Sequence, residues 1–97
     1  MRTMHELVDA MISAGTLESP AIINAFRAVD RKYFVPKLWS NEAYMDNPLP
    51  IGDGQTISQP TTVAFMLEKL AAQKGDKVLD IGSGSGWTTA LLCHIVG

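Results

Sequence analysis

Three alternating glycines near the end of the chain form the segment with the clearest chemical use. Residues 82–86 have the sequence Gly-Ser-Gly-Ser-Gly, after a short apolar run at residues 77–81 and before an apolar run at residues 87–96. A glycine turn between a strand and a helix lets backbone N–H groups approach a ligand, and the helix N-terminus adds partial positive charge. The pattern predicts a site for an anionic or carbonyl-bearing nucleotide cofactor.

The spacing of the glycines narrows the choice of cofactor. A phosphate-binding P-loop ends in Gly-Lys-Ser or Gly-Lys-Thr, whereas this loop ends in Gly86, Trp87 and Thr88. The dinucleotide fingerprint is Gly-x-Gly-x-x-Gly, and here the third glycine comes one residue early. This tighter form resembles motif I of the class I S-adenosylmethionine-dependent methyltransferases. The resemblance implies S-adenosyl-L-methionine as the cofactor, bound by Asp80, Gly82, Ser83, Gly84 and Gly86.

A second motif precedes the glycine loop and is more specific. Residues 50–60, Pro-Ile-Gly-Asp-Gly-Gln-Thr-Ile-Ser-Gln-Pro, are similar to the signature segment of the protein-L-isoaspartate O-methyltransferases. Matching runs occur in the family's order at residues 34–36, 43–46 and 78–86, so the resemblance covers nearly the whole chain. Asp80 stands where many members have glutamate, and Trp87 where many have tyrosine. The first difference keeps the negative charge, and the second keeps an aromatic ring.

The resemblance implies a repair activity on L-isoaspartyl residues of damaged proteins and peptides. A methyl group would pass from S-adenosyl-L-methionine to the free carboxylate of the isoaspartyl residue. A carboxylate with a pKa of about 3.9 is already ionised at neutral pH, and a sulfonium is an activated methyl donor. Such a site needs positioning and exclusion of water rather than a general base. The lack of a Ser-His-Asp or paired-carboxylate pattern agrees with this chemistry.

The signature segment supplies the candidate catalytic and substrate-binding residues. By resemblance, Ser58 lies near the substrate carboxylate, and Thr56, Ile57 and Gln59 shape the pocket. From the local pattern alone, Thr56 and Ser58 would instead cap the helix that opens at Pro60. One hydroxyl could serve both purposes, so both interpretations stay open at this point.

Other residues with chemical potential have simpler interpretations. Asp46 and Asp53 could face substrate, although solvated loop carboxylates are the favoured interpretation. His5 is expected on the surface of an amphipathic helix or partly buried there. Cys93 and His94 are neighbours on the last helix and point about 100° apart, which makes a poor metal pair. Structural packing is expected of both, and no metal site is predicted.

Local signals predict the elements that position these residues. Helices are expected at residues 4–14, at residues 20–29, from Pro60 and at residues 87–96, with short strands at 49–51, 55–57 and 77–81. Thr3 and Glu6 have capping-box spacing, Gly15 is a stop signal, and Ser19 can cap a helix that begins at proline. A strand, a glycine loop and a helix open a doubly wound α/β domain.

The whole chain is expected to be one partial domain. Residues 1–59 form an N-terminal helical and substrate-loop region, and residues 60–97 begin the Rossmann-like cofactor-binding region. With 97 residues, 46% of them hydrophobic, the composition is that of a small globular domain. A net charge of -2 gives no basic field for nucleic acid or anionic membranes. A single cysteine, no spanning segment and no signal peptide predict a cytoplasmic protein.

The end of the chain limits what these residues can do alone. The acidic residue that holds the ribose is due roughly 20 residues after a glycine loop, at about position 106, and a doubly wound sheet needs further strands. We therefore expect a truncated N-terminal portion that is inactive by itself. Two alternatives remain: a class I methyltransferase with another substrate, against which the signature segment argues, and a non-catalytic module that pairs through strand edges.

Overall fold

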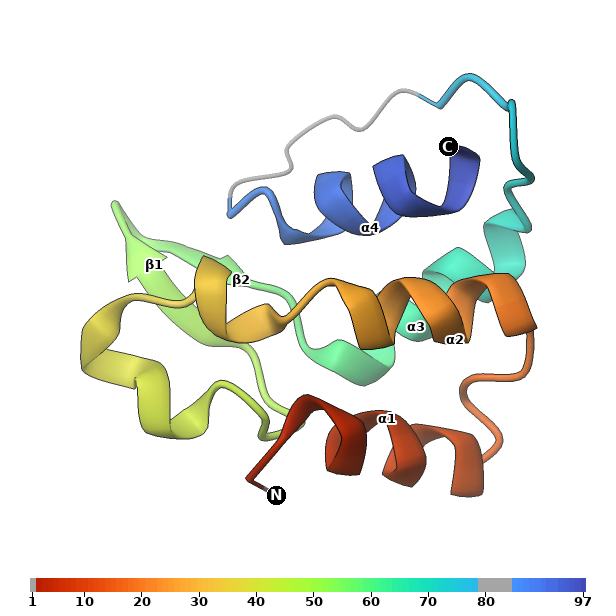
Figure 1. Ribbon diagram of the computed structural model, residues 1–97. Helices are drawn as coiled ribbons and strands as arrows, with labels where there is room; N and C mark the ends of the chain where they lie inside the picture. Colours follow the sequence, from red (N-terminus) through yellow and green to blue (C-terminus); the bar gives the residue numbers. More distant parts are fainter. Residues whose placement is uncertain (1, 79–84) are drawn as a thin grey trace.

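The computed structural model describes residues 2–78 and 85–97, which form helices and one short hairpin (Figure 1). The elements in chain order are α1 (Met4–Ser13), α2 (Pro20–Ala28), the 3₁₀ helices η1 (Arg31–Phe34) and η2 (Lys37–Glu42), β1 (Leu49–Gly52), β2 (Gln55–Ile57), α3 (Pro60–Leu70) and α4 (Trp87–Val96). The four helices and the two short strands at 49–51 and 55–57 are thus confirmed where the sequence predicts them.

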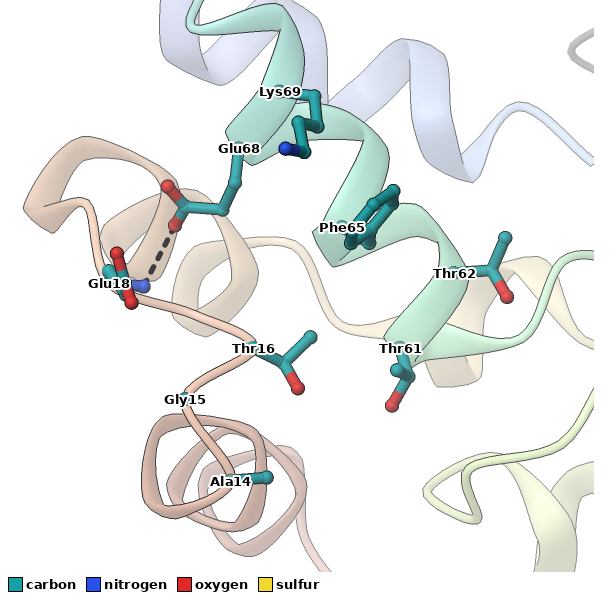
Figure 2. A pocket seen from close by; sticks show the side chains of 9 residues that line it. All are labelled: Ala14, Gly15, Thr16, Glu18, Thr61, Thr62, Phe65, Glu68 and Lys69. Carbon is teal, nitrogen blue, oxygen red and sulfur yellow. Dashed lines mark hydrogen bonds between the residues drawn. The ribbon is translucent and has the colours of Figure 1, made fainter.

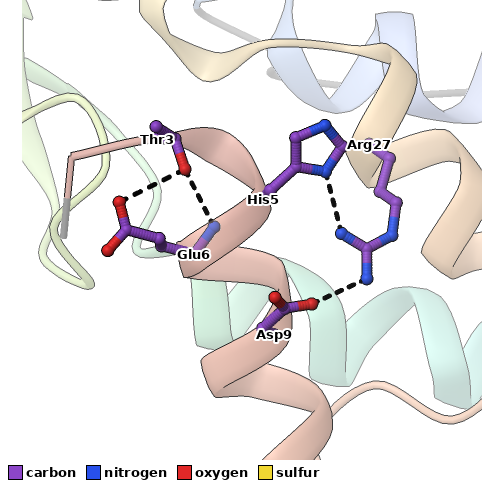
Figure 3. A network of polar contacts seen from close by, with 5 residues as sticks. All are labelled: Thr3, His5, Glu6, Asp9 and Arg27. Carbon is purple, nitrogen blue, oxygen red and sulfur yellow. Dashed lines mark hydrogen bonds and ion pairs between the residues drawn. The ribbon is translucent and has the colours of Figure 1, made fainter.

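Local hydrogen bonds define both ends of α1. The Oγ1 atom of Thr3 accepts a hydrogen bond from the N–H of Glu6 at 3.1 Å, as the capping-box spacing predicts (Figure 3). Beyond the last turn, Gly15 has a φ of 78°, a left-handed conformation that glycine adopts readily. The N–H of Thr16 then bonds the carbonyl of Met11 at 2.9 Å. The predicted stop at Gly15 is confirmed.

The start of α2 confirms the predicted position of its cap but not the use of the capping hydroxyl. Ser19 is the N-cap residue and Pro20 the first helical residue, yet the Ser19 side chain makes no capping hydrogen bond. Instead, its hydroxyl donates to Oε1 of Glu68 at 2.6 Å. The other carboxylate oxygen of Glu68 accepts from the N–H groups of Glu18 and Ser19 at 2.8 and 2.9 Å. This bond set ties the α1–α2 connection to α3.

The hydrophobic core is arranged around α2. This helix contacts α1, α3 and α4, and Figure 1 shows it between α1 and α4. Phe26 of α2 meets Trp87 of α4 edge to face, with ring centroids 5.6 Å apart and planes at 85°. Such pairs contribute about 0.5–1.5 kcal/mol beyond their buried area. Both side chains are fully buried, together with Leu7, Val8, Ala25, Ala64 and Leu91. Burial of Trp87 therefore fixes the first turn of α4 against the N-terminal helices.

The hairpin of β1 and β2 carries most of the signature segment. The strands are antiparallel, with Leu49 opposite Ile57 and Pro50 opposite Thr56. Asp53 and Gly54 form the turn with φ values of 51° and 70°, and two positive φ angles are the requirement of a type I′ turn. The Asp-Gly pair is a favoured sequence for that turn. Leu49 and Ile57 are buried, so this pair attaches the hairpin to the core.

Part of the predicted Rossmann-like unit lies outside the described residues. Lys77 and Val78 are not in a strand, and residues 79–81 of the predicted strand, like residues 82–84 of the glycine loop, are not described.

In the described part of the chain, no helix has both the length and the apolar character needed to cross a membrane. The cytoplasmic location remains a prediction.

Candidate functional site

A cavity between α3 and α4 brings the signature segment close to the end of the glycine loop. Its volume is about 420 Å³. Ser58 comes from the signature segment, Thr88 from the first turn of α4, and Val78 directly precedes the undescribed residues 79–84. The remaining lining residues are Val63, Phe65, Met66, Leu67, Lys69, Leu70 and Leu92. We call this hollow the α3–α4 cavity; two hydroxyl-bearing residues, Ser58 and Thr88, are among its largely apolar lining residues.

Of the four residues predicted from the signature segment, Ser58 lines this cavity. Its side chain is exposed to solvent. Thr56 is exposed on β2, whereas Ile57 is buried at 2% exposure and packs in the core. Gln59 donates from Nε2 to the carbonyl of Asp46 at 3.0 Å. Contact of Thr56, Ile57 and Gln59 with a substrate stays a prediction. Burial of Ile57 and the Gln59 hydrogen bond hold the backbone on both sides of Ser58.

The cap of α3 comes from Asp46, which corrects two expectations. Neither Thr56 nor Ser58 caps this helix: the N-cap residue is Gln59, without a capping side-chain bond. Asp46 Oδ1 instead accepts the N–H of Thr61 at 2.9 Å, and Oδ2 accepts the Thr61 hydroxyl. Asp46 is therefore a half-buried helix cap rather than a solvated carboxylate. The sequence did not indicate this cap, because Thr61 lies fifteen residues after Asp46.

Asp53 and His5 agree with their simpler interpretations. Asp53 is exposed in the hairpin turn. His5 is exposed on α1, and its Nδ1 lies 3.0 Å from Nη1 of Arg27, whose Nη2 pairs with Asp9 at 2.8 Å (Figure 3). This network joins α1 to α2 on the surface. Neither residue reaches the α3–α4 cavity.

Cys93 and His94 depart from the expected packing. Both are exposed, because the buried face of α4 is formed by Trp87, Leu91, Leu92 and Ile95 instead. Cys93 is a free thiol. Within residues 2–78 and 85–97, no three His, Cys, Asp or Glu side chains gather in a way that could hold a metal ion.

The end of the glycine loop turns tightly into α4. Gly86 is the N-cap of α4, with a φ of 84°. The Ser85 Oγ atom accepts the N–H of Trp87 at 3.2 Å, which satisfies one free donor of the first turn. Of the predicted cofactor residues, Gly86 is described, and Asp80, Gly82, Ser83 and Gly84 lie outside the described residues.

Sequence reasoning missed two residues near this site, Thr88 and Arg31. Thr88 lines the cavity, and its position two residues after the last loop glycine was the available signal. Arg31 is fully buried, and its guanidinium donates to the carbonyl of Ser58 at 3.1 Å. Burial lowers the pKa of Arg31 to about 10, against the opposing effect of the Asp46 carboxylate. The only signal for Arg31 in the sequence was its place in an aromatic-rich segment, residues 31–39.

A larger hollow of about 660 Å³ lies between the α1–α2 connection and α3 (Figure 2). Thr16, Glu18, Thr61 and Glu68 are among its lining residues. Its walls include neither Ser58 nor any residue next to the glycine loop. The Glu68 carboxylate there already accepts hydrogen bonds from Glu18 and Ser19. We therefore favour the smaller α3–α4 cavity as the candidate site.

Comparison with known proteins gives one consistent family. The family model described as protein-L-isoaspartate(D-aspartate) O-methyltransferase matches residues 2–97. Among curated relatives, protein-L-isoaspartate O-methyltransferase 2 of Anaeromyxobacter sp. (strain Fw109-5) is 46% identical over 93 residues, covering 96% of this chain and 38% of the relative. The protein-L-isoaspartate O-methyltransferase of Methanospirillum hungatei is 49% identical over 88 residues, covering 91% of this chain and 41% of the relative.

Solved structures agree with the sequence relatives. A Plasmodium falciparum protein assigned as a protein-L-isoaspartate O-methyltransferase, crystallised with S-adenosyl-L-homocysteine, superposes with a TM-score of 0.84 and 27% identity over 96% of this chain and 42% of that chain. A second solved protein-L-isoaspartate O-methyltransferase superposes with a TM-score of 0.82 and 32% identity, over 97% of this chain and 31% of that chain. The expected fold class is confirmed. The chain spans about two fifths of the length of these curated relatives.

Proposed function

Because the chain belongs to the protein-L-isoaspartate(D-aspartate) O-methyltransferase family, we propose that the protein containing it is an S-adenosyl-L-methionine-dependent protein carboxyl O-methyltransferase. Its substrates are L-isoaspartyl residues in damaged proteins and peptides, and the product is a methyl ester of the free carboxylate. One observation supports this most: Ser58 of the signature segment and Thr88 of the glycine-loop helix line the same cavity.

The two parts of the chain take different roles in this proposal. Residues 1–59 form the substrate side, with Ser58 as the residue next to the isoaspartyl carboxylate. Residues 60–97 begin the cofactor side, with Asp80, Gly82, Ser83, Gly84 and Gly86 holding S-adenosyl-L-methionine. The positive φ of Gly86 fits this role, because it lets the chain turn tightly into α4. The Plasmodium falciparum neighbour, which was crystallised with S-adenosyl-L-homocysteine, supports the choice of cofactor.

The chemistry requires orientation more than acid or base groups. S-adenosyl-L-methionine, when bound, supplies an already activated methyl group. The substrate carboxylate is ionised at neutral pH, since an ordinary aspartyl pKa is about 3.9. The Ser58 hydroxyl donates a hydrogen bond to one carboxylate oxygen and leaves the other free to attack. The buried side chains of Val63 and Leu67 form part of an apolar wall beside this position.

Replacement of the cavity hydroxyl tests this assignment. In the protein expressed from its whole reading frame, we expect Ser58→Ala to lower kcat/KM for an isoaspartyl peptide by about tenfold, the size of one lost hydrogen bond to a charged group. Affinity for S-adenosyl-L-homocysteine should stay unchanged. Ser40→Ala, on exposed η2, is the matched control. Normal isoaspartyl methylation by the Ser58 variant would remove Ser58 from the site.

A further inference from the structure

Arg31 is a buried cation that holds the backbone of the substrate side. Its side chain has 0% exposure at the first position of η1. Nη1 donates to the carbonyls of Ala43 and Met45 at 3.1 Å each. Nη2 donates to the carbonyls of Asn47 and Ser58 at 2.7 and 3.1 Å. One guanidinium thus connects two parts of the chain, the segment between η2 and β1 and the residue after β2.

These four bonds depend on the shape of the guanidinium. It presents five N–H donors in a rigid plane, whereas a lysine ammonium has three donors around one point. Carbonyls of four different residues meet this plane, and all of them lie 12 to 27 residues away in sequence. Lysine at this position keeps the charge and cannot reproduce the bond set.

The other contact of Arg31 reaches the cofactor side. Its guanidinium carbon lies 5.4 Å from the centroid of the Trp87 ring, within the range of a cation–π interaction. Trp87 is the first residue of α4 and directly follows Gly86. The guanidinium is therefore in contact both with the backbone of Ser58 and with the residue that begins the helix after the glycine loop.

Stability alone does not explain a charge in this place. Burial of a cation is costly, and its desolvation lowers the Arg31 pKa to about 10. Among the described residues, the buried Nε atom of Arg31 has no hydrogen-bond partner, which adds to the cost. Well-packed apolar groups often replace buried charges without loss of stability. The geometry that the guanidinium imposes is the remaining advantage.

We propose that Arg31 is a positioning residue that fixes Ser58 relative to the start of α4, and so places the substrate carboxylate relative to the methyl donor. The role rests on the proposed function. Arg31 does not itself line the α3–α4 cavity; it acts through the carbonyl of Ser58 and the ring of Trp87.

Steady-state kinetics of Arg31→Lys test this role in the protein expressed from its whole reading frame. The isoaspartyl peptide KM should rise by about tenfold, because the displaced Ser58 hydroxyl loses its hydrogen bond to the charged substrate carboxylate. The KM for S-adenosyl-L-methionine should change by less than about threefold, because Trp87 keeps its contact with Phe26 and its Nε1–H bond to the carbonyl of Val29. A merely structural role would reduce the folded fraction, which lowers kcat and leaves both KM values unchanged.

Two controls separate this effect from chemistry and from stability. Arg27→Lys makes the same substitution on the surface of α2, where Arg27 pairs with Asp9. Leu7→Ala opens the core at α1, away from the α3–α4 cavity. It controls for any stability that Arg31→Lys loses. Neither control should change the peptide KM.

A second variant decides the matter if Arg31→Lys does not fold. Trp87→Phe keeps an aromatic ring against Phe26 but removes the indole beside the guanidinium, so the peptide KM should rise by about threefold. A wild-type peptide KM in every folded variant of this pair would overturn the proposal. Wild-type protein is assayed first: its failure to methylate the isoaspartyl peptide would reject the proposed function, and the role of Arg31 with it.

Discussion

Gly86 combines a left-handed backbone with the position next to the predicted cofactor turn. Its φ is 84°, and a Cβ there would meet the Phe34 ring at 3.9 Å, an ordinary contact. The cost of a side chain therefore comes from the backbone, at about 1–2 kcal/mol. We expect Gly86→Ala to lower the free energy of unfolding by that amount in denaturant titrations. Cys93→Ala, an exposed change on the same helix, is the control. Equal stability of both variants would contradict the described turn.

Individual residues also show which parts of the candidate site the sequence could indicate. Ser58 was singled out because it belongs to a contiguous motif, and the structure places it in the lining of the α3–α4 cavity. Gly86 was singled out from the glycine spacing, and the structure gives it a positive φ. Arg31 was missed because the four carbonyls that it binds become neighbours only after folding. The exposure of Cys93 was also missed, since the apolar pattern of α4 does not tell which side meets the core.

At the scale of elements, local chemistry predicted most of the structure. The capping box of Thr3 and the stop at Gly15 each act within a few residues, and both were predicted. The Asp-Gly turn of the hairpin is equally local but was not singled out in advance. Caps supplied from a distance could not be predicted in this way. Ser19 gives its hydroxyl to Glu68, and Asp46 caps α3, because tertiary contacts offered better partners than the local backbone.

The cap of α3 gives a test at this scale. We expect Asp46→Ala to destabilise the protein by about 0.5–2 kcal/mol, because the N–H of Thr61 loses its acceptor. Thermal unfolding followed by circular dichroism measures the change. Asn47→Ala is the matched control, since Asn47 contributes its backbone carbonyl to Arg31 and keeps that carbonyl as alanine. An Asp46 variant as stable as the Asn47 variant would show that the cap is not needed.

At the scale of the whole molecule, one helix connects the two halves of the candidate site. α2 contacts α1, α3 and α4, so residues 1–59 and the described residues after Pro60 share one core (Figure 1). The sequence predicted the two sides but not this arrangement, because periodicity indicates which face of a helix is apolar and not which helix covers it. Met66 and Leu70 illustrate this limit: they lie at helical spacing from the buried Val63 and Leu67, yet both are more than half exposed.

Glu68 makes the stability of the whole chain depend on pH. Burial raises the pKa of this carboxyl, but hydrogen bonds from Ser19 and Glu18 outweigh that effect, and the pKa lies below its ordinary value. A lowered pKa contributes stability above the unfolded pKa of about 4.3, and this contribution disappears as the pH falls through the folded value. The difference in unfolding free energy between wild type and Glu68→Gln should therefore shrink in acid. A difference that stays constant with pH would contradict this network, and Glu18→Gln serves as the control.

The most direct test of the central claim is methyl transfer to two peptides that differ only in an isoaspartyl or an aspartyl linkage. Labelled S-adenosyl-L-methionine is supplied to the protein expressed from its whole reading frame, beside the 97-residue chain. The proposed function predicts transfer of label to the isoaspartyl peptide and none to its aspartyl twin. Binding of the cofactor without methylation of the isoaspartyl peptide would contradict the proposed substrate and leave the fold intact.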